Sequence, residues 1–119
     1  MLPKPLGHYS QIVRAGDLFF LSGQIAIDPI TNEICLFGGD AAKQTNLILK
    51  NIETILAGEN LKKENIVKMT LCLTDLSQFS KVNEVYADFF GTHKPARTTV
   101  EVAGLPKGAA IEIETVAQS

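Results

Sequence analysis

The sequence predicts an α+β fold in which two helices pack on one face of a mixed β-sheet. Two segments show the apolar periodicity of amphipathic helices, whereas other segments alternate apolar and polar side chains as strands do. The predicted order is βββαβαββ, in which the helices are too few and the strands too clustered for a doubly wound parallel sheet. The 119 residues show no change of composition where a linker could lie, so we expect one domain over residues 1–119.

The first half of the chain predicts an extended arm, a meander of strands and a helix. Two prolines and Gly7 mark the arm. Three strands follow, separated by turn residues, over residues 9–13, 18–27 and 33–37. Asp40 can cap a helix that ends at Gly58. Its apolar or small side chains recur in steps of four and three, at Ala41, Thr45, Ile48, Ile52 and Ile55.

The second half predicts a central strand, a second helix and two final strands. Residues 66–73 alternate so that one face of the strand is fully apolar. Asp75 or Ser77 can cap the helix, and Gly91 ends it. The apolar side chains of this helix are Phe79, Val82, Tyr86, Phe89 and Phe90. The final strands are expected over residues 96–102 and 110–117.

Composition narrows the functional classes. The net charge is −2 and the basic residues are scattered, so we expect no nucleic-acid partner. The apolar content of 45% is high for so small a domain, and we therefore expect some apolar surface to be buried between subunits. Cys35 and Cys72 are interpreted as reduced thiols. No apolar run is long enough for a signal peptide or a membrane span, which predicts a cytoplasmic protein without membrane contact.

Arg97 is the first candidate site residue, because it stands at the start of a predicted strand. Alternation places Arg97, Thr99 and Glu101 on the same face of that strand. A guanidinium carries a planar fork of donors that suits a carboxylate or a phosphate. The alternative interpretation is an arginine that forms a salt bridge on a solvated sheet face.

Asn83 and two glutamates are further candidates. Asn83 shares a helical stripe with three aromatic residues, so its amide faces the interior, where it either serves a site or ties the helix to a backbone group. Glu112 and Glu114 lie on one face of the last strand. If both faces of the sheet are buried, such a carboxylate needs a partner, and Arg97 is the obvious cation. On an edge strand with a wet face, both glutamates would simply be solvated.

The sequence lacks the motifs of phosphate-binding loops, metal sites and serine-hydrolase triads. There is no glycine-rich phosphate loop, and the two histidines, His8 and His93, do not have the spacing of metal ligands. Ser22 has no histidine in a context that makes a hydrolase triad. We therefore expect no metal and no cofactor, and a reaction that uses Arg, Glu, Tyr, Asn, backbone groups and water.

The motifs, taken together and in order, cover essentially the whole chain. They are Gly7-His8-Tyr9-Ser10-Gln11, Ser22-Gly23-Gln24, Asp28-Pro29, Gln44-Thr45, Asn51, Asn83-Glu84-Val85-Tyr86 with Phe89-Phe90, Pro95-Ala96-Arg97-Thr98, Leu105-Pro106 and Ile111-Glu112-Ile113-Glu114. This set resembles the Rid family, also called YjgF-like, whose RidA subgroup comprises enamine and imine deaminases. The resemblance implies a chorismate-mutase-like α+β fold, a homotrimer, and active sites in the clefts between subunits.

The resemblance also implies a reaction and roles for residues. The substrates would be 2-iminobutanoate and 2-iminopropanoate, which are hydrolysed to 2-oxo acids and ammonia. Arg97 would bind the substrate carboxylate, and Glu112 would activate the attacking water. Tyr9, Ser22 and Asn83 match other pocket positions, and the backbone of Thr99 would meet the imine nitrogen. An Arg97 next to Glu112 would keep that carboxylate ionised.

The sequence departs from the family pattern at three places. His8 stands where proline is usual, Thr99 stands where cysteine is common, and the loop over residues 91–94 is short. Two alternative functions remain open at this point. One is a ribonuclease or translation inhibitor, as some relatives are described. The other is a non-catalytic, chaperone-like trimer that binds a metabolite.

Overall fold

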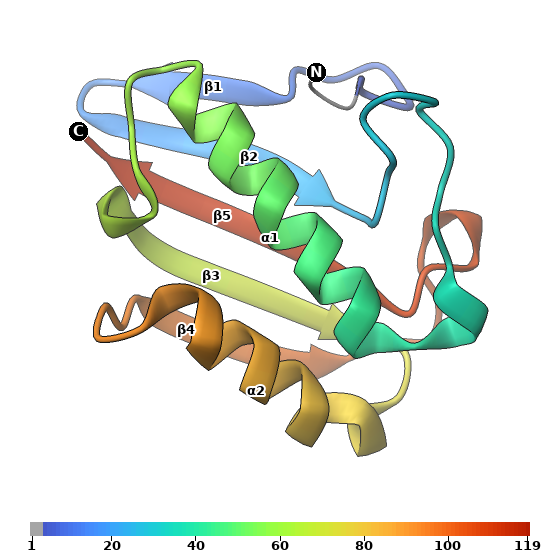
Figure 1. Cartoon of the computed structure of the whole chain (residues 1–119). Coiled ribbons are helices and arrows are strands. Elements are labelled where there is room, and N and C mark those ends of the chain that lie inside the picture. Colours follow the sequence, from blue (N-terminus) through green and yellow to red (C-terminus); the bar gives the residue numbers. More distant parts are fainter. Residues whose placement is uncertain (1–3) are drawn as a thin grey trace.

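The structure, a computed structural model, describes residues 4–119 and has a five-stranded sheet with both helices on one of its faces (Figure 1). The order of strands across the sheet is β1-β2-β5-β3-β4, in which β3 and β4 are parallel and the other neighbours antiparallel. The elements are β1 (Ile12–Ala15), β2 (Leu18–Gln24), α1 (Ala41–Ala57), β3 (Ile66–Leu73), α2 (Phe79–Phe90), β4 (Ala96–Glu101) and β5 (Ile111–Gln118). The predicted α+β class, with a mixed sheet and two helices on one face, is confirmed.

Helix α1 begins where the sequence predicts, whereas α2 begins later than a cap at Asp75 or Ser77 would place it. The Asp40 side chain accepts hydrogen bonds from the backbone N–H groups of Ala42 and Lys43, at 3.0 and 3.1 Å, and so caps α1. The Asp75 side chain accepts from Ser77 N–H and so caps a short 3-10 turn, Leu76–Gln78, whereas α2 itself begins after Gln78 and has no side-chain cap. Gly91 ends α2 with φ near +63°, a conformation that favours glycine. No helix in residues 4–119 is long and apolar enough to cross a membrane.

The register gives the sheet two different faces. In β3, Met69, Leu71 and Leu73 are fully buried beneath the helices. The opposite face carries Cys72, which pairs in register with Glu112, and it has no helix on it (Figure 1). The exposed apolar side chains Val13, Phe20 and Val100 also lie on this uncovered face, as their register with neighbouring strands shows. This chain therefore leaves an apolar sheet surface open.

The third predicted strand, residues 33–37, does not form. Only an isolated bridge between Ile27 and Ile34 remains, so the observed order of elements is ββαβαββ. Buried amides of α1 satisfy backbone carbonyls of this region, because Asn51 donates to Ile27 O and Gln44 donates to Leu36 O, both at 2.7 Å. A helix thus supplies the hydrogen bonds that a sheet neighbour would otherwise make.

The N-terminal strand is shorter than predicted. It begins at Ile12, and Tyr9 instead lies in a tight turn in which its N–H donates to Gly7 O at 3.0 Å. β2 ends at Gln24 after a shift of register beyond Leu21. The first residues of the predicted arm, 1–3, lie outside the described residues.

Candidate active site

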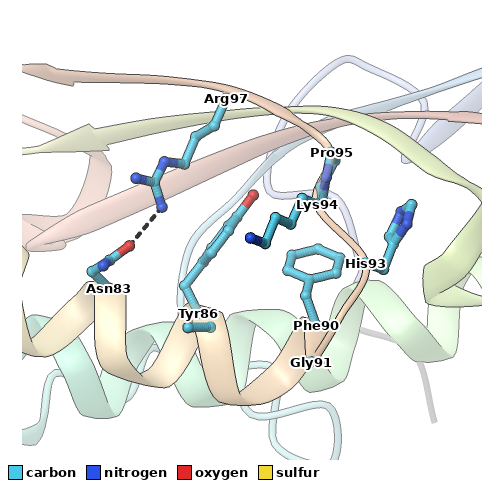
Figure 2. A pocket seen from close by; sticks show the side chains of 9 residues that line it. Asn83, Tyr86, Phe90, Gly91, His93, Lys94, Pro95 and Arg97 are labelled. Carbon is cyan, nitrogen blue, oxygen red and sulfur yellow. Dashed lines mark hydrogen bonds between the residues drawn. The ribbon is translucent and has the colours of Figure 1, made fainter.

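Arg97 is held in a fixed position between β4 and α2. Its Nη1 donates a hydrogen bond of 2.7 Å to Asn83 Oδ1 (Figure 2). Its Cζ lies 5.1 Å from the ring centroid of Phe79 and 4.9 Å from that of Tyr86, within the range of cation–π contacts. Within residues 4–119, no carboxylate forms an ion pair with this guanidinium. The remaining N–H groups can therefore bind an external anion, which favours the interpretation as an anion site over a surface salt bridge.

A cavity of about 430 Å³ lies next to Arg97, between α2 and the segment that enters β4. Tyr86 and Phe90 line it from the helix, and His93, Lys94 and Arg97 line it from the other side (Figure 2). The His93 ring is fixed by a 2.8 Å contact between Nε2 and a backbone carbonyl, which requires the proton to be on Nε2. This cavity is of the size that proteins use to bind small molecules.

Tyr86 is a site residue that the sequence analysis did not select. Its side chain is only 7% exposed, and its hydroxyl is closed off from solvent and has no hydrogen-bond partner in the part of the chain that the structure describes. Burial raises the pKa of Tyr86, and the charge of Arg97 opposes that shift. The sequence pattern could have identified Tyr86, because it lies on the same helical stripe as Asn83 and two phenylalanines.

A second group of candidate residues lies around Glu112 of β5. Tyr9, Ser22, Gly23 and Glu112 line a shallower hollow of about 260 Å³. The Ser22 hydroxyl donates to Ser10 O at 2.7 Å, so it fastens the N-terminal arm to β2. The Tyr9 hydroxyl accepts from a backbone N–H at 3.1 Å while nearly half of the side chain stays exposed.

Gly23 permits the close approach of Glu112. A Cβ atom at position 23 would lie 2.7 Å from Glu112 Oε2 and 2.8 Å from its Cδ, closer than real contacts allow. Burial raises the pKa of Glu112 above its usual range, and the nearby charge of Glu114 adds to this effect. Arg97 is not among the causes of that shift, so one chain does not keep Glu112 ionised in the way the sequence suggests.

The two groups lie on opposite faces of the sheet. Arg97 and Thr99 pair with Met69 and Leu71, which face the helices, whereas Glu112 pairs with Cys72 on the uncovered face. In addition, β3 lies between β4 and β5. The expectation that Arg97 neighbours Glu112 is therefore wrong within a single chain. The structure brings Asn83 to Arg97 and brings Tyr9 and Ser22 to Glu112.

Thr99 belongs to the Arg97 side of the sheet. Its Oγ1 is closed off from solvent and has no hydrogen-bond partner among residues 4–119. Because β4 is an edge strand, some of its backbone N–H and C=O groups point away from β3. Those backbone groups are open to a ligand or to a neighbouring chain.

Comparison with known proteins decides the family. The sequence model of the family described as Endoribonuclease L-PSP matches residues 2–119. A solved structure of a protein of the conserved Rid family, YyfA from Yersinia pestis, has a TM-score of 0.93 at 44% identity, covering 99% of this chain and 93% of that one. The chain belongs to the Rid (YjgF-like) family.

Other Rid relatives agree over the same length. The RutC family protein of Pyrococcus horikoshii is 49% identical over 115 residues, which is 97% of this chain and 90% of the relative. RidA from an Antarctic Psychrobacter has a TM-score of 0.93 at 36% identity, covering 99% of this chain and 94% of that one. TdcF of E. coli, solved with bound serine, has a TM-score of 0.90 at 40% identity, covering 99% and 93%.

Proposed function

We propose that this protein is a homotrimeric deaminase that hydrolyses 2-iminobutanoate and 2-iminopropanoate to 2-oxo acids and ammonia. The observation that carries the proposal is the guanidinium of Arg97, which Asn83 and two aromatic rings hold in place while no carboxylate of the described residues pairs with it. A fixed arginine fork is suited to two parallel hydrogen bonds with a substrate carboxylate. The Rid relative TdcF was solved with bound serine, which carries a carboxylate of this kind.

The active site would be assembled from two subunits. One subunit supplies Arg97, Asn83 and Thr99, and its neighbour supplies Glu112, Tyr9 and Ser22 from the other face of its own sheet. A closed ring of three chains repeats this pairing three times. The exposed apolar side chains of the uncovered sheet face, such as Phe20, are the surface that such a ring would bury.

The chemistry needs water, a base and an orienting anion site. Arg97 binds the carboxylate and so places C2 of the imine near Glu112. The Glu112 carboxylate takes a proton from water while the water oxygen bonds to C2 and the C=N electron pair moves to nitrogen. Glu112 passes its proton to the nitrogen, the proton of the new hydroxyl also moves to the nitrogen, and the C–N bond breaks to release ammonia and leave a C=O bond. Each turnover consumes one water molecule.

The residues fit these roles without a cofactor. Imines of 2-oxo acids hydrolyse in water, so orientation and fixed dipoles supply the acceleration. A general base works best when its pKa is not far below the working pH, and the raised pKa of Glu112 is a shift in that direction. The backbone of Thr99 on the edge strand would hydrogen-bond to the imine nitrogen.

The proposal is tested with freshly generated 2-iminobutanoate, by following the release of 2-oxobutanoate against buffer. Arg97→Ala and Glu112→Gln are each expected to lose activity, the latter by about 10²–10⁴-fold, as is typical of a general base. If the site lies between subunits, refolding the two variants together at equal amounts restores about a quarter of the sites, because one neighbour keeps Arg97 and the other keeps Glu112.

Three outcomes would contradict the proposal. Full deaminase activity of Arg97→Ala in a verified trimer would remove its central residue and leave a binding module. Absence of any recovery on mixing would place the site within one chain. Cleavage of RNA by the parent protein, without deamination, would favour the ribonuclease alternative. The net charge of −2 does not favour RNA binding.

A further inference from the structure

We propose that the cavity next to Arg97 also accepts 2-imino acids whose side chain carries a second carboxylate, and binds them more tightly than aliphatic ones of equal length because Lys94 binds this second group. The inference rests on the proposed function, since it assigns the first carboxylate to Arg97. It concerns the part of the site that would receive the substrate side chain. The substrate class is that of the acidic amino acids in their imino form, such as 2-iminoglutarate and 2-iminosuccinate.

The size of the cavity is the first observation. Its volume of about 430 Å³ is far more than a methyl or ethyl side chain requires. The space continues from Arg97 along α2, past the rings of Tyr86 and Phe90, to His93 and Lys94 (Figure 2). A longer substrate side chain would therefore have room on the side of Arg97 that leads toward Lys94.

The charge of the cavity is the second observation. Arg97 and Lys94 both line it, and none of its lining residues is an aspartate or a glutamate. Figure 2 shows the Lys94 side chain extended toward Tyr86, on the side of the cavity that holds Arg97. Two cations that share a partly closed space repel each other, and a ligand with two carboxylates would neutralise both.

The lack of a partner for Lys94 is the third observation. Among residues 4–119, its ammonium takes part in no hydrogen bond or ion pair. Two other lysines of the chain do have partners, because Lys63 donates to Phe89 O and Lys68 donates to Thr98 Oγ1, each at 2.7 Å. Lys94 has a flexible four-carbon stem, so its ammonium can follow the end of a ligand side chain.

A second carboxylate on a 2-imino acid would suit both the ammonium of Lys94 and the proposed imine hydrolysis. Imines at C2 of a carboxylic acid arise by oxidation or elimination from 2-amino acids, and the acidic amino acids differ from the aliphatic ones by one carboxylate at the end of the side chain. The reaction that supplies the substrate would therefore be an oxidation of an acidic amino acid. Its hydrolysis product would be a 2-oxo dicarboxylate.

The test compares two ligands of equal chain length, 2-oxoglutarate and 2-oxopentanoate, by titration calorimetry with the intact protein. The parent protein is expected to bind 2-oxoglutarate about tenfold more tightly, the effect of one hydrogen bond to a charged group. Lys94→Gln should bring the ratio of the two dissociation constants close to one, and Lys94→Arg should keep the preference. Lys50→Gln, an exposed position on α1 with the same change of charge, is the matched control and should leave the ratio as it is.

The same ratio is then measured in turnover, with 2-iminoglutarate and 2-iminopentanoate generated in place. Equal binding of both acids by the parent protein overturns the inference, and so does a preference that survives in Lys94→Gln. Either of these results leaves the assignment of Arg97 intact. If neither acid binds at all, the proposed function fails, because its anion site is then absent.

Discussion

Replacement of Gly23 by alanine is expected to damage turnover with little effect on the fold. The added Cβ would lie 2.7 Å from Glu112 Oε2 and 2.8 Å from Cδ. An ordinary contact begins at about 3.4 Å, so the carboxylate has to move by roughly 0.5–1 Å. The backbone of Gly23 does not have a positive φ, so alanine introduces no backbone strain there.

The size of the effect follows from that displacement. A misplacement of about 1 Å at a reacting group costs on the order of 10²-fold in rate, so we expect kcat to fall by about 10–100-fold. The free energy of unfolding should change by less than about 1 kcal/mol, because the atoms that must move are the free end of a half-buried side chain. Binding of 2-oxobutanoate should remain within about twofold, since in the proposed site the ligand carboxylate is bound by Arg97 of the neighbouring subunit, whereas the added Cβ meets only Glu112.

The assay measures release of 2-oxobutanoate from 2-iminobutanoate, together with urea unfolding and calorimetric binding of 2-oxobutanoate. Gly104→Ala is the matched control, because a Cβ at that position meets no atom within 4 Å and the backbone there does not have a positive φ. Gly104→Ala should keep the parental kcat. A Gly23→Ala protein with the parental kcat would refute the reasoning, since the position of the Glu112 carboxylate would then not matter.

Three further predictions concern individual groups of the site. Because the pKa of Glu112 is raised, activity should appear at a higher pH, as pH increases, than an ordinary glutamate base would give. Glu114→Gln removes one cause of the shift and should move this acid limb of the rate profile to lower pH. An unmoved limb would contradict the assignment of Glu112 as the base. Tyr86→Phe keeps the ring under Arg97 and removes a buried hydroxyl without a partner, so urea unfolding should show a gain of about 1 kcal/mol; a loss of stability would mean that the hydroxyl does have a partner. Thr99→Ala should retain deaminase activity within a few-fold, because the proposed contact uses the backbone, and a hundredfold loss would assign the role to the hydroxyl instead.

Local patterns in the sequence predicted the helices and most strands correctly. Asp40 caps α1 as expected, because capping depends on residues only a few positions apart, whereas Asp75 caps a short 3-10 turn that precedes α2. Alternation correctly placed Arg97 with Thr99 on one face, and Glu112 with Glu114 on one face. The strand predicted over residues 33–37 was wrong. Gln44 and Asn51 of α1, distant in the sequence, donate to the backbone carbonyls of Leu36 and Ile27 in this region.

The relation between strands was decided by the tertiary structure alone. Alternation says which residues of one strand share a face, but it does not say which face of the sheet that is or which strand lies alongside. The insertion of β3 between β4 and β5, and the opposite orientations of Arg97 and Glu112, follow from the order of the strands. The contact of Gly23 with Glu112 likewise joins residues far apart in the chain. The sequence by itself determined which groups are available for chemistry, because residue type and local spacing suffice for that, whereas only long-range packing sets which of those groups meet.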